Sequence, residues 1–374
     1  MPMKNTILHI SKYYFPYFGG IETLAKSMAE GMTEYRNVVV CFATDGKDST
    51  DTINGVTVHR VKVNFSMMSQ DVAFGYYQTL KRLMSEYKPK YVHVHCPNPY
   101  VYPLVLKVIH PDTKLILHWH SDILAKGIVY KFIKPFEKAI LKRADLIVAT
   151  SPNYIHPSSP IYPYKEKTDI VQNGIITADF DKQEGDDEKI AAIKAQYSNK
   201  KLLLFIGRHI HYKGIDWLIE LEKMVKEDCH FIIAGQGPMT QQLKAKAKSP
   251  RITFTGRLST DDLRCYTHAA DIFTFTSNTK AEAFGIALAE AMYCRCVPIV
   301  FHLEGSGVNW VSIKDQTGLE VPLGDLSGYA KAIDLLITDN LLRERLGDAA
   351  HQRVIDMFTE QSSVSIMEAI YKKL

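Results

Sequence analysis

Short apolar runs alternate with longer amphipathic stretches along most of the 374-residue chain. In the first half, the runs predict strands at 6–10, 38–43, 56–61, 91–95, 114–119 and 146–150, with helical periodicity between them, as at 21–34. The second half repeats the design with strands at 202–206, 230–234, 252–255, 272–275 and 297–300. Such alternation predicts an α/β fold with parallel, doubly wound sheets.

The chain is too long for one ordinary hydrophobic core and suits two domains. Residues 179–188 are rich in charge and poor in apolar side chains, and they follow Gln-Asn-Gly-Ile at 172–175. We therefore expect a hinge near residue 175. The resulting boundaries are a first domain at 1–175, a second at 176–358 and a terminal amphipathic helix at 359–374.

Two carboxylates, Glu282 and Glu290, stand eight residues apart where a loop runs into a helix. The free N–H groups of a helix N-terminus, here around Phe284, Gly285 and Ile286, attract a phosphate, and a glycine removes a Cβ from its path. Carboxylates repel phosphate but accept hydrogen bonds from sugar or ribose hydroxyls. The combination suggests a nucleotide sugar, although an amphipathic helix with two exposed glutamates explains the spacing equally well.

Two cations, Arg208 and Lys213, flank the turn between the strand at 202–206 and a following helical pattern. Ligands of open α/β sheets bind outside the carboxyl ends of the strands, so these cations are placed to neutralise a departing diphosphate. Either cation alone is more often a solvated surface charge. Gly-Gln-Gly at 235–237 resembles a dinucleotide fingerprint, but the third glycine is missing.

The first predicted strand leads into a glycine turn, Phe18-Gly19-Gly20-Ile21-Glu22. Gly19 and Gly20 precede a helix and can present N–H groups to an anion, whereas an ordinary tight turn is the simpler interpretation. Glu22 caps this turn or binds substrate.

A histidine-rich segment, His118-Trp119-His120-Ser121-Asp122, ends a later strand. Two histidines and an aspartate are acceptable metal ligands, but a buried strand residue is the simpler explanation of His118. His93 and His95, on the preceding strand, include packing residues, and the Pro-Asn-Pro loop that follows at 97–99 could line the acceptor side.

Five segments now carry a resemblance: Phe-Ile-Gly-Arg at 205–208, Tyr-Lys-Gly at 212–214, Gly-Gln-Gly at 235–237, Phe-Thr-Gly at 254–256 and Glu282 through Glu290. Their order and spacing resemble family-four retaining glycosyltransferases of the GT-B fold, over nearly the whole chain. Within that family, the segments at 119–122, 281–285 and 305–310 look most like bacterial mannosyl- and rhamnosyltransferases of surface-polysaccharide and O-antigen assembly.

The resemblance implies two Rossmann-like domains that face an interdomain cleft, with the last helix crossing back onto the first domain. It implies that His120 contacts the transferred sugar and that Gly19 and Gly20 contact the donor diphosphate. The resemblance also implies that Gly256 takes part in binding the donor. Asp122 would orient the imidazole of His120 or touch the acceptor.

Composition excludes several other classes of protein. The net charge of +4 gives no case for nucleic acid, and six cysteines without a Cys-x-x-Cys pair suggest reduced thiols. No run of about 20 apolar residues appears, so we expect a cytoplasmic protein without membrane spans. The segment 126–143 is basic and amphipathic, which fits either docking on anionic lipid at the inner face of the plasma membrane or an ordinary helix packed on a sheet.

We therefore expect a retaining hexosyltransferase that uses a nucleotide-diphosphate sugar, GDP-mannose being favoured, with a lipid-linked saccharide as acceptor. No cofactor and no metal are expected, because the catalytic groups implied are His120, Arg208, Lys213 and Glu282. Glu290 would bind the ribose. A GT-B epimerase and a non-catalytic nucleotide-sugar-binding subunit are the alternatives.

Overall fold

The computed structural model describes residues 4–17, 19–67, 70–123, 128–157 and 159–374, with the backbone alone at 128 and 129. Phe18 of the glycine turn and Lys126 of the basic segment lie outside these residues. The chain divides into two compact units: unit 1 contains Met1–Asn173 and Gln361–Leu374, and unit 2 contains Gly174–Glu360. These divisions fall within two residues of the boundaries expected at 175 and 358.

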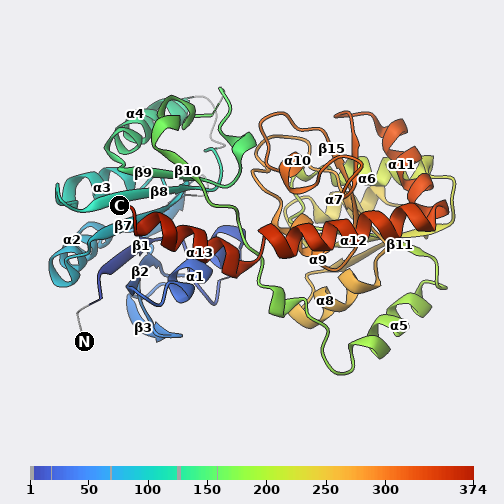
Figure 1. Cartoon of the computed structure of the whole chain (residues 1–374), viewed down its shortest axis with the longest axis horizontal. Helices are drawn as coiled ribbons and strands as arrows, with labels where there is room; N and C mark the ends of the chain where they lie inside the picture. Colours follow the sequence, from blue (N-terminus) through green and yellow to red (C-terminus); the bar gives the residue numbers. More distant parts are fainter. Residues whose placement is uncertain (1–3, 18, 68–69, 124–127, 158) are drawn as a thin grey trace. The chain divides into compact units, whose positions relative to one another are not determined.

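Unit 1 is built on an eight-stranded sheet with the order β10-β9-β8-β7-β1-β2-β4-β3 (Figure 1). All neighbours are parallel except β3, which pairs antiparallel with β4. A separate hairpin is formed by β5 and β6. The strands are β1 (Thr6–Ile10), β2 (Arg36–Phe42), β3 (Ser49–Ile53), β4 (Val56–Val61), β5 (Phe65–Met67), β6 (Gln70–Val72), β7 (Tyr91–Cys96), β8 (Lys114–Trp119), β9 (Leu146–Ala149) and β10 (Thr168–Ile170).

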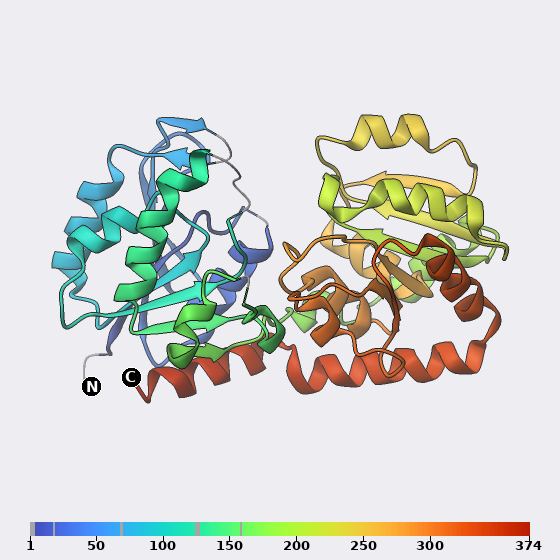
Figure 2. The ribbon, with the colours of Figure 1, turned by 90° about the horizontal axis from the view of Figure 1, so that it is seen from above.

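The helices of unit 1 are α1 (Gly20–Gly31), α2 (Tyr76–Tyr87), α3 (Tyr102–Val108), α4 (Ile128–Arg143) and α13 (Glu360–Tyr371), with short 3₁₀ turns η1 (Pro152–Tyr154) and η2 (Tyr162–Lys167). One core cluster joins Met28 of α1 and Met367 of α13 to Tyr91 and Ile116 of the sheet. The C-terminal helix therefore buries its apolar stripe on unit 1, where Figure 2 shows it in red.

Unit 2 contains a six-stranded parallel sheet with the order β13-β12-β11-β14-β15-β16. The strands are β11 (Lys201–Ile206), β12 (Cys229–Ala234), β13 (Ile252–Gly256), β14 (Ile272–Phe275), β15 (Val297–Phe301) and β16 (Leu319–Val321). The helices are α5 (Asp186–Gln196), α6 (Ile215–Met224), α7 (Thr240–Lys246), α8 (Thr260–Ala269), α9 (Ile286–Tyr293), α10 (Val308–Val311), α11 (Leu326–Thr338) and α12 (Asn340–Met357), with turns η3 (Thr177–Asp179) and η4 (His211–Lys213).

The strands predicted from apolar runs are confirmed, most of them to within one residue at either end. The prediction missed β3, β5, β6, β10 and β16. β3 is an edge strand with mostly exposed residues, so it has no buried face that would give an apolar pattern. The helix predicted at 21–34 ends earlier, at Gly31.

Both sheets reverse their strand order beside the first strand of the unit. In unit 1 the reversal lies between β1 and β7, and in unit 2 it lies between β11 and β14. Connections leave such a pair of strands in opposite directions, which opens a crevice at their carboxyl ends where α/β proteins bind ligands. Among the described residues, no helix combines the length and the apolar character needed to cross a bilayer.

Candidate functional site

A buried ion pair lies at the reversal point of unit 2. Lys213 ends the turn after β11, and Glu282 stands in the loop after β14, so the two neighbouring strands deliver both side chains to one edge of the sheet. The Lys213 ammonium contacts the Glu282 carboxylate, and these side chains are only 13% and 12% exposed. The structure thus brings together two residues that stand 69 positions apart in the sequence.

Several groups hold this pair in place. The Ser277 hydroxyl donates to Glu282 Oε2 at 3.0 Å, and the ammonium of Lys213 lies 5.4 Å from the centroid of the Phe275 ring. Burial by itself would lower the pKa of Lys213, but the Glu282 carboxylate more than offsets that effect and the pKa is raised. Lys213 therefore stays charged at neutral pH.

The backbone around Lys213 depends on glycine. Gly214 has φ +64°, and a Cβ at this position would lie 2.2 Å from the carbonyl oxygen of Thr276. The Thr276 hydroxyl donates to the carbonyl of Lys213 at 2.9 Å. The turn after β11 is thereby fixed against the chain leaving β14, which directs Lys213 toward Glu282.

The Gly-Gln-Gly segment at 235–237 also serves packing. A Cβ on Gly235 would lie 2.0 Å from the Gly207 carbonyl oxygen, and one on Gly237 would lie 2.5 Å from that of His209. These glycines let the turn after β12 lie directly against the turn after β11. Their resemblance to a dinucleotide fingerprint is explained by this backbone contact.

The loop carrying Glu282 runs into α9, whose N-cap is Gly285 with φ +90°. The prediction that Gly285 keeps a Cβ out of the path of a phosphate was wrong. A Cβ on Gly285 would point at the Leu288 Cβ and the Phe275 ring, each 3.2 Å away, and so into the core rather than into the path of a phosphate. Glycine is required here by the left-handed backbone. In the first turn of α9 the Leu288 N–H donates to the Gly285 carbonyl at 3.0 Å, which leaves the N–H groups of Ile286 and Ala287 as the donors that a ligand could meet.

Glu290 lies on the same helix and is half-buried. Burial, and secondarily the nearby Asp179 carboxylate, raise its pKa to about 7. A carboxyl group poised near neutrality is a common feature of ligand sites, because the ligand can supply the donors that a buried carboxylate lacks.

The other predicted residues of unit 2 differ in exposure. Arg208 is exposed on the turn after β11. Gly256 ends β13 with open space where a Cβ would stand. The Phe284 side chain is 3% exposed and packs against the Phe358 ring at 5.4 Å, so only its backbone can face a ligand.

In unit 1, a carboxylate already faces the glycine turn before α1. A Cβ on Gly19 would lie 2.2 Å from Glu22 Oε2, and Gly20 begins the helix. Burial raises the pKa of Glu22, while a hydrogen bond from its own backbone N–H acts in the opposite direction. Of the two roles considered for Glu22, this geometry favours capping, and a diphosphate at Gly19 would have to displace the carboxylate.

The structure places His120 in a layer of five buried histidines. His9 lies on β1, His93 and His95 on β7, and His118 on β8, with His120 directly after β8; none is more than 5% exposed. His120 Nε2 lies 3.1 Å from His95 Nδ1, and the two rings are parallel to within 2°. Desolvation lowers the pKa of His120 to about 3, so the ring is neutral.

Asp122, grouped with these histidines in the sequence, has other partners. The Trp119 indole donates to Asp122 Oδ1 at 3.0 Å, and the Asp122 backbone N–H donates to the Tyr154 hydroxyl at 2.7 Å. The residue that bonds the His120 ring is His95, on the strand whose histidines were expected to include packing residues. The two-residue spacing of histidines on both strands was the available signal, because it puts them on one face of adjacent parallel strands.

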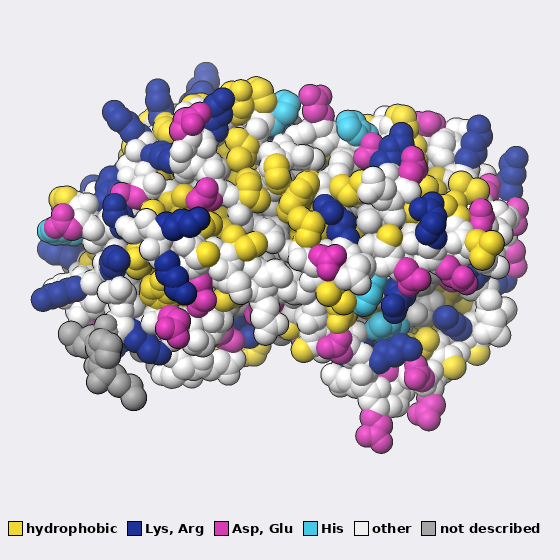
Figure 3. Space-filling view, viewed as in Figure 1, with side chains coloured by type: hydrophobic (Ala, Val, Ile, Leu, Met, Phe, Trp, Pro, Cys, Tyr) yellow, Lys and Arg dark blue, Asp and Glu magenta, His cyan; other side chains and the backbone are white. Residues whose placement is uncertain are grey.

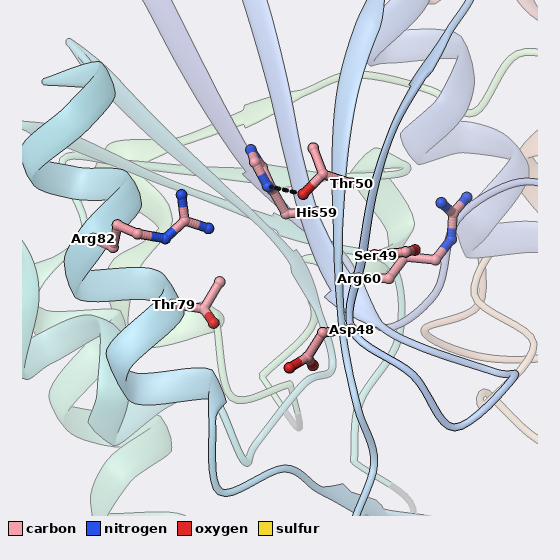
Figure 4. Close-up of a pocket in the computed structure, with 7 residues that line it drawn as sticks. All are labelled: Asp48, Ser49, Thr50, His59, Arg60, Thr79 and Arg82. Atoms are coloured by element: carbon pink, nitrogen blue, oxygen red, sulfur yellow. Dashed lines mark hydrogen bonds between the residues drawn. The ribbon is translucent and has the colours of Figure 1, made fainter.

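A surface pocket lies elsewhere on unit 1, between the β3–β4 hairpin and α2 (Figure 4). Its two arginines already have acidic partners, Asp51 for Arg60 and Glu86 for Arg82. None of the predicted site residues lines it. We therefore do not include this pocket in the candidate site.

The fold and the unit 2 site define a class: a GT-B glycosyltransferase, with two Rossmann-like units and a charged pair at the strand ends. Family models agree with the class, since Glycosyltransferase Family 4 matches residues 18–179 and Glycosyl transferases group 1 matches residues 186–353. The chain therefore contains a Glycosyltransferase Family 4 domain followed by a Glycosyl transferases group 1 domain.

Curated relatives span almost the whole chain. O-antigen chain mannosyltransferase C of Escherichia coli is 25% identical over 98% of both chains. The D-rhamnosyltransferase WbpZ of Pseudomonas aeruginosa is 28% identical over 94% of this chain and 92% of its own.

Solved structures show the same fold at lower identity. Sucrose-phosphate synthase of Thermosynechococcus elongatus superposes with a TM-score of 0.78 at 18% identity, covering 99% of both chains. Anabaena HepE, solved in complex with UDP and glucose, has a TM-score of 0.76 at 17% identity and covers 99% of this chain and all of its own.

Proposed function

We propose that this glycosyltransferase moves a hexose, with retention of anomeric configuration, from a nucleotide-diphosphate sugar to a lipid-linked saccharide in bacterial polysaccharide or O-antigen assembly. The donor we favour is GDP-mannose. The observation that carries the proposal is the buried Lys213–Glu282 pair at the reversal point of the unit 2 sheet. A cation and a carboxylate together match a ligand that has both a diphosphate and sugar hydroxyls.

The names of two relatives support hexosyl transfer and O-antigen assembly. Two proteins that match nearly the full length of the chain are an O-antigen mannosyltransferase and a D-rhamnosyltransferase. HepE has been solved with UDP-glucose, which supports a nucleotide sugar as the class of donor without fixing the base or the sugar.

The mechanism follows from where charge develops. Cleavage of the anomeric bond leaves an oxocarbenium-like sugar and a diphosphate, and the leaving group gains negative charge in the transition state. Lys213, Arg208 and the N–H groups at the start of α9 would stabilise that charge. Glu282 would hold sugar hydroxyls, Glu290 the ribose and His120 the transferred sugar.

Retention does not require a covalent intermediate in this scheme. We propose that the acceptor hydroxyl attacks the sugar on the face from which the diphosphate departs, and that the diphosphate takes up the acceptor proton. Because protein cations and helix N–H groups stabilise the leaving group, the transfer step needs no metal ion.

Lipid-linked acceptors stay in the bilayer, so we propose that unit 1 docks at the inner face of the plasma membrane through α4. Lys131, Lys134 and Lys138 are exposed on this helix, as is Phe132, which is 72% exposed. Figure 3 shows Lys and Arg side chains gathered over α4 at the upper left. Glu137, the acid within this segment, is buried, accepts from the Tyr130 hydroxyl at 2.7 Å and has a pKa that burial raises.

The epimerase and the binding subunit remain the competing functions. An epimerase would convert the donor without an acceptor, and a binding subunit would hold the donor without turnover. The Lys213–Glu282 pair favours an enzyme, because a binding protein gains little from a cation aimed at charge that develops only during reaction.

The test begins with a screen of nucleotide sugars for thermal stabilisation, since a ligand that binds the folded state raises its stability. The best donor is then incubated with a polyprenyl-diphosphate saccharide, and the new linkage is assigned by NMR. We expect a glycoside with the donor's anomeric configuration. An inverted linkage would overturn the retaining mechanism, and donor turnover without a glycoside would favour the epimerase.

A further inference from the structure

The buried histidine layer of unit 1 has more ring nitrogens than its protein partners satisfy. His9 Nδ1, His95 Nε2, His118 Nε2 and His120 Nδ1 are buried and have no hydrogen-bond partner among the described residues. Leaving a buried polar atom unpaired destabilises the fold, so several such atoms in one layer indicate a bound water or ion.

Strand register explains how the layer forms. β1, β7 and β8 are adjacent and parallel, with His9 opposite His93 and His95 opposite His118. Alternate residues of a strand share a face, so His93 and His95 project to the same side, as do His118 and His120. The fold therefore brings five imidazoles together from three chain segments.

From this arrangement we propose that His93, His95 and His118 bind one divalent transition-metal ion of the Zn²⁺ class. One ring nitrogen from each of these residues lies within 4.8 Å of the others. His93 Nε2 and His118 Nδ1 are 3.3 Å apart and share a hydrogen bond, which a bound ion would replace. Two nitrogens that each lie about 2.0–2.1 Å from a tetrahedral ion are separated by about 3.3 Å, so this pair already has the spacing of two ligands.

The chemistry of the donors selects the class of ion. Imidazole nitrogens suit Zn²⁺, Co²⁺, Ni²⁺ and Cu²⁺, whereas Mg²⁺ and Ca²⁺ prefer oxygen ligands. A neutral imidazole keeps one N–H and offers its other nitrogen as a metal ligand. Three histidines leave a fourth position for a small ligand.

An outer contact orients one of the ligands. His93 Nδ1 lies 2.8 Å from the Tyr371 hydroxyl of α13, and metal-binding histidines commonly have their second nitrogen held in this way. The rings of His93 and His95 are stacked with centroids 4.6 Å apart, so sharing an ion requires one ring to turn about its side-chain torsions. The ion would then join β7 and β8 and, through Tyr371, fix the C-terminal helix on unit 1.

The site differs from both alternatives raised by the sequence. It uses His93 and His95 in place of His120 and Asp122, and it is separate from the leaving-group chemistry proposed for unit 2. Its test therefore does not depend on transferase activity.

The experiment titrates the full-length, metal-stripped protein with Zn²⁺ alone and with Co²⁺ alone. We expect one ion per chain by elemental analysis, visible Co²⁺ absorption typical of a tetrahedral nitrogen site, and a rise in melting temperature with Zn²⁺ concentration. His95→Asn and His118→Asn should each weaken binding at least tenfold. Binding by the wild type that is absent, or unchanged in both variants, would overturn the proposal.

Matched controls exclude other ligands. His110→Asn and His302→Asn change exposed histidines, and Cys294→Ala removes a thiol that lies 3.6 Å from His268 Nε2. All three should bind the ion as the wild type does. If the core variants fail to fold, X-ray absorption of the wild-type Co²⁺ complex decides: imidazole-dominated coordination supports the site, and sulfur ligands or oxygen ligands alone overturn it.

Discussion

The two units share a sheet design but differ in the chemistry at the point where strand order reverses. In unit 2, the turns beyond β11 and β14 carry a charged pair, Lys213 and Glu282, at the edge of an apolar core. In unit 1, the strands β1 and β7 themselves carry neutral imidazoles inside the sheet layer. In unit 2, each side chain of the buried pair stays charged because it has an oppositely charged partner. In unit 1, the histidines have no such partner, and burial favours their neutral form.

This difference assigns separate tasks to the two units. A charged pair at strand ends can respond to a charged donor, because one partner can be exchanged for a ligand. A buried layer of neutral imidazoles has no net positive charge to attract an anion, and burial opposes the protonation that would supply it. We therefore expect substitutions in unit 2 to change the chemistry of transfer, and changes in unit 1 to affect stability, acceptor access or the sugar contact of His120.

The largest effect is expected when the unit 2 cation is removed. Lys213→Ala should lower kcat at saturating donor by about 10²–10³-fold, the usual cost of losing one group that stabilises developing charge. Arg208→Ala should act in the same direction. The measurement is steady-state transfer kinetics, with circular dichroism to check folding.

Lys223→Ala is the matched control, because this lysine is exposed on α6 and pairs only with the neighbouring Glu220 in the described contacts. It should leave kcat unchanged. Near-wild-type kinetics in both Lys213→Ala and Arg208→Ala would reject the leaving-group assignment and remove the contrast between the units.

The next effect tests the surface of unit 1. Replacing Lys131, Lys134 and Lys138 with Glu should weaken sedimentation with anionic vesicles about a hundredfold, since each near-surface cation contributes roughly 1 kcal/mol. Activity on a short soluble acceptor should persist. Binding of the parent protein should also weaken with salt, because the Debye length falls from about 10 Å at 0.1 M to about 3 Å at 1 M.

A triple Glu replacement at Lys244, Lys246 and Lys248 makes the same charge change on unit 2. Vesicle binding should survive it. If both triple variants lose binding equally, net charge alone is responsible. If neither loses it, α4 is only a structural helix.

A smaller effect is expected at Glu290. Ribose hydroxyls donate to the carboxylate, so the donor should bind the ionised form, and affinity should rise as pH increases through about 7, the pKa of this group. Glu290→Gln should flatten that pH dependence and weaken donor binding about tenfold, as expected for the loss of one hydrogen bond to a charged group. Isothermal titration from pH 5.5 to 8.5 measures both.

The same raised pKa has an opposite consequence for stability. The unfolded carboxyl titrates near its ordinary pKa of 4.5, so its contribution to stability is present below that pH and is lost as pH rises through about 7. Glu290→Gln should therefore melt higher than the wild type above pH 7 and similarly to it at pH 4.5. A melting difference that does not change with pH would contradict the assigned pKa.

The smallest effect is expected from chelation. Excess EDTA in the assay should leave transfer unchanged, because protein groups stabilise the leaving diphosphate in the proposed mechanism. Loss of activity on chelation that one divalent ion restores would overturn metal independence. If the metal-stripped protein has a lower melting temperature but an unchanged transfer rate, an ion bound by the histidine layer stabilises the fold and takes no part in catalysis.

The sequence alone determined the fold class, most strands and the segments that form the unit 2 site. Parallel strands are buried on both faces, so they can be recognised in the sequence as continuous apolar runs of strand length. Lys213 and Glu282 were found because a turn after a strand and a loop before a helix have local signatures. The edge strand β3 was missed, since its exposed residues leave no such pattern.

The tertiary structure decided which of these residues meet. Strand order, set by packing across the sheet, placed Lys213 beside Glu282 and aligned the histidines of β1, β7 and β8. The folded backbone also places the Glu22 carboxylate against Gly19, and packing of α4 on unit 1 buries Glu137. Spacing along the chain cannot reveal that Lys213 meets Glu282 or that the histidines align, because both outcomes depend on contacts between segments far apart in sequence, and burial at those contacts sets the charge of each group.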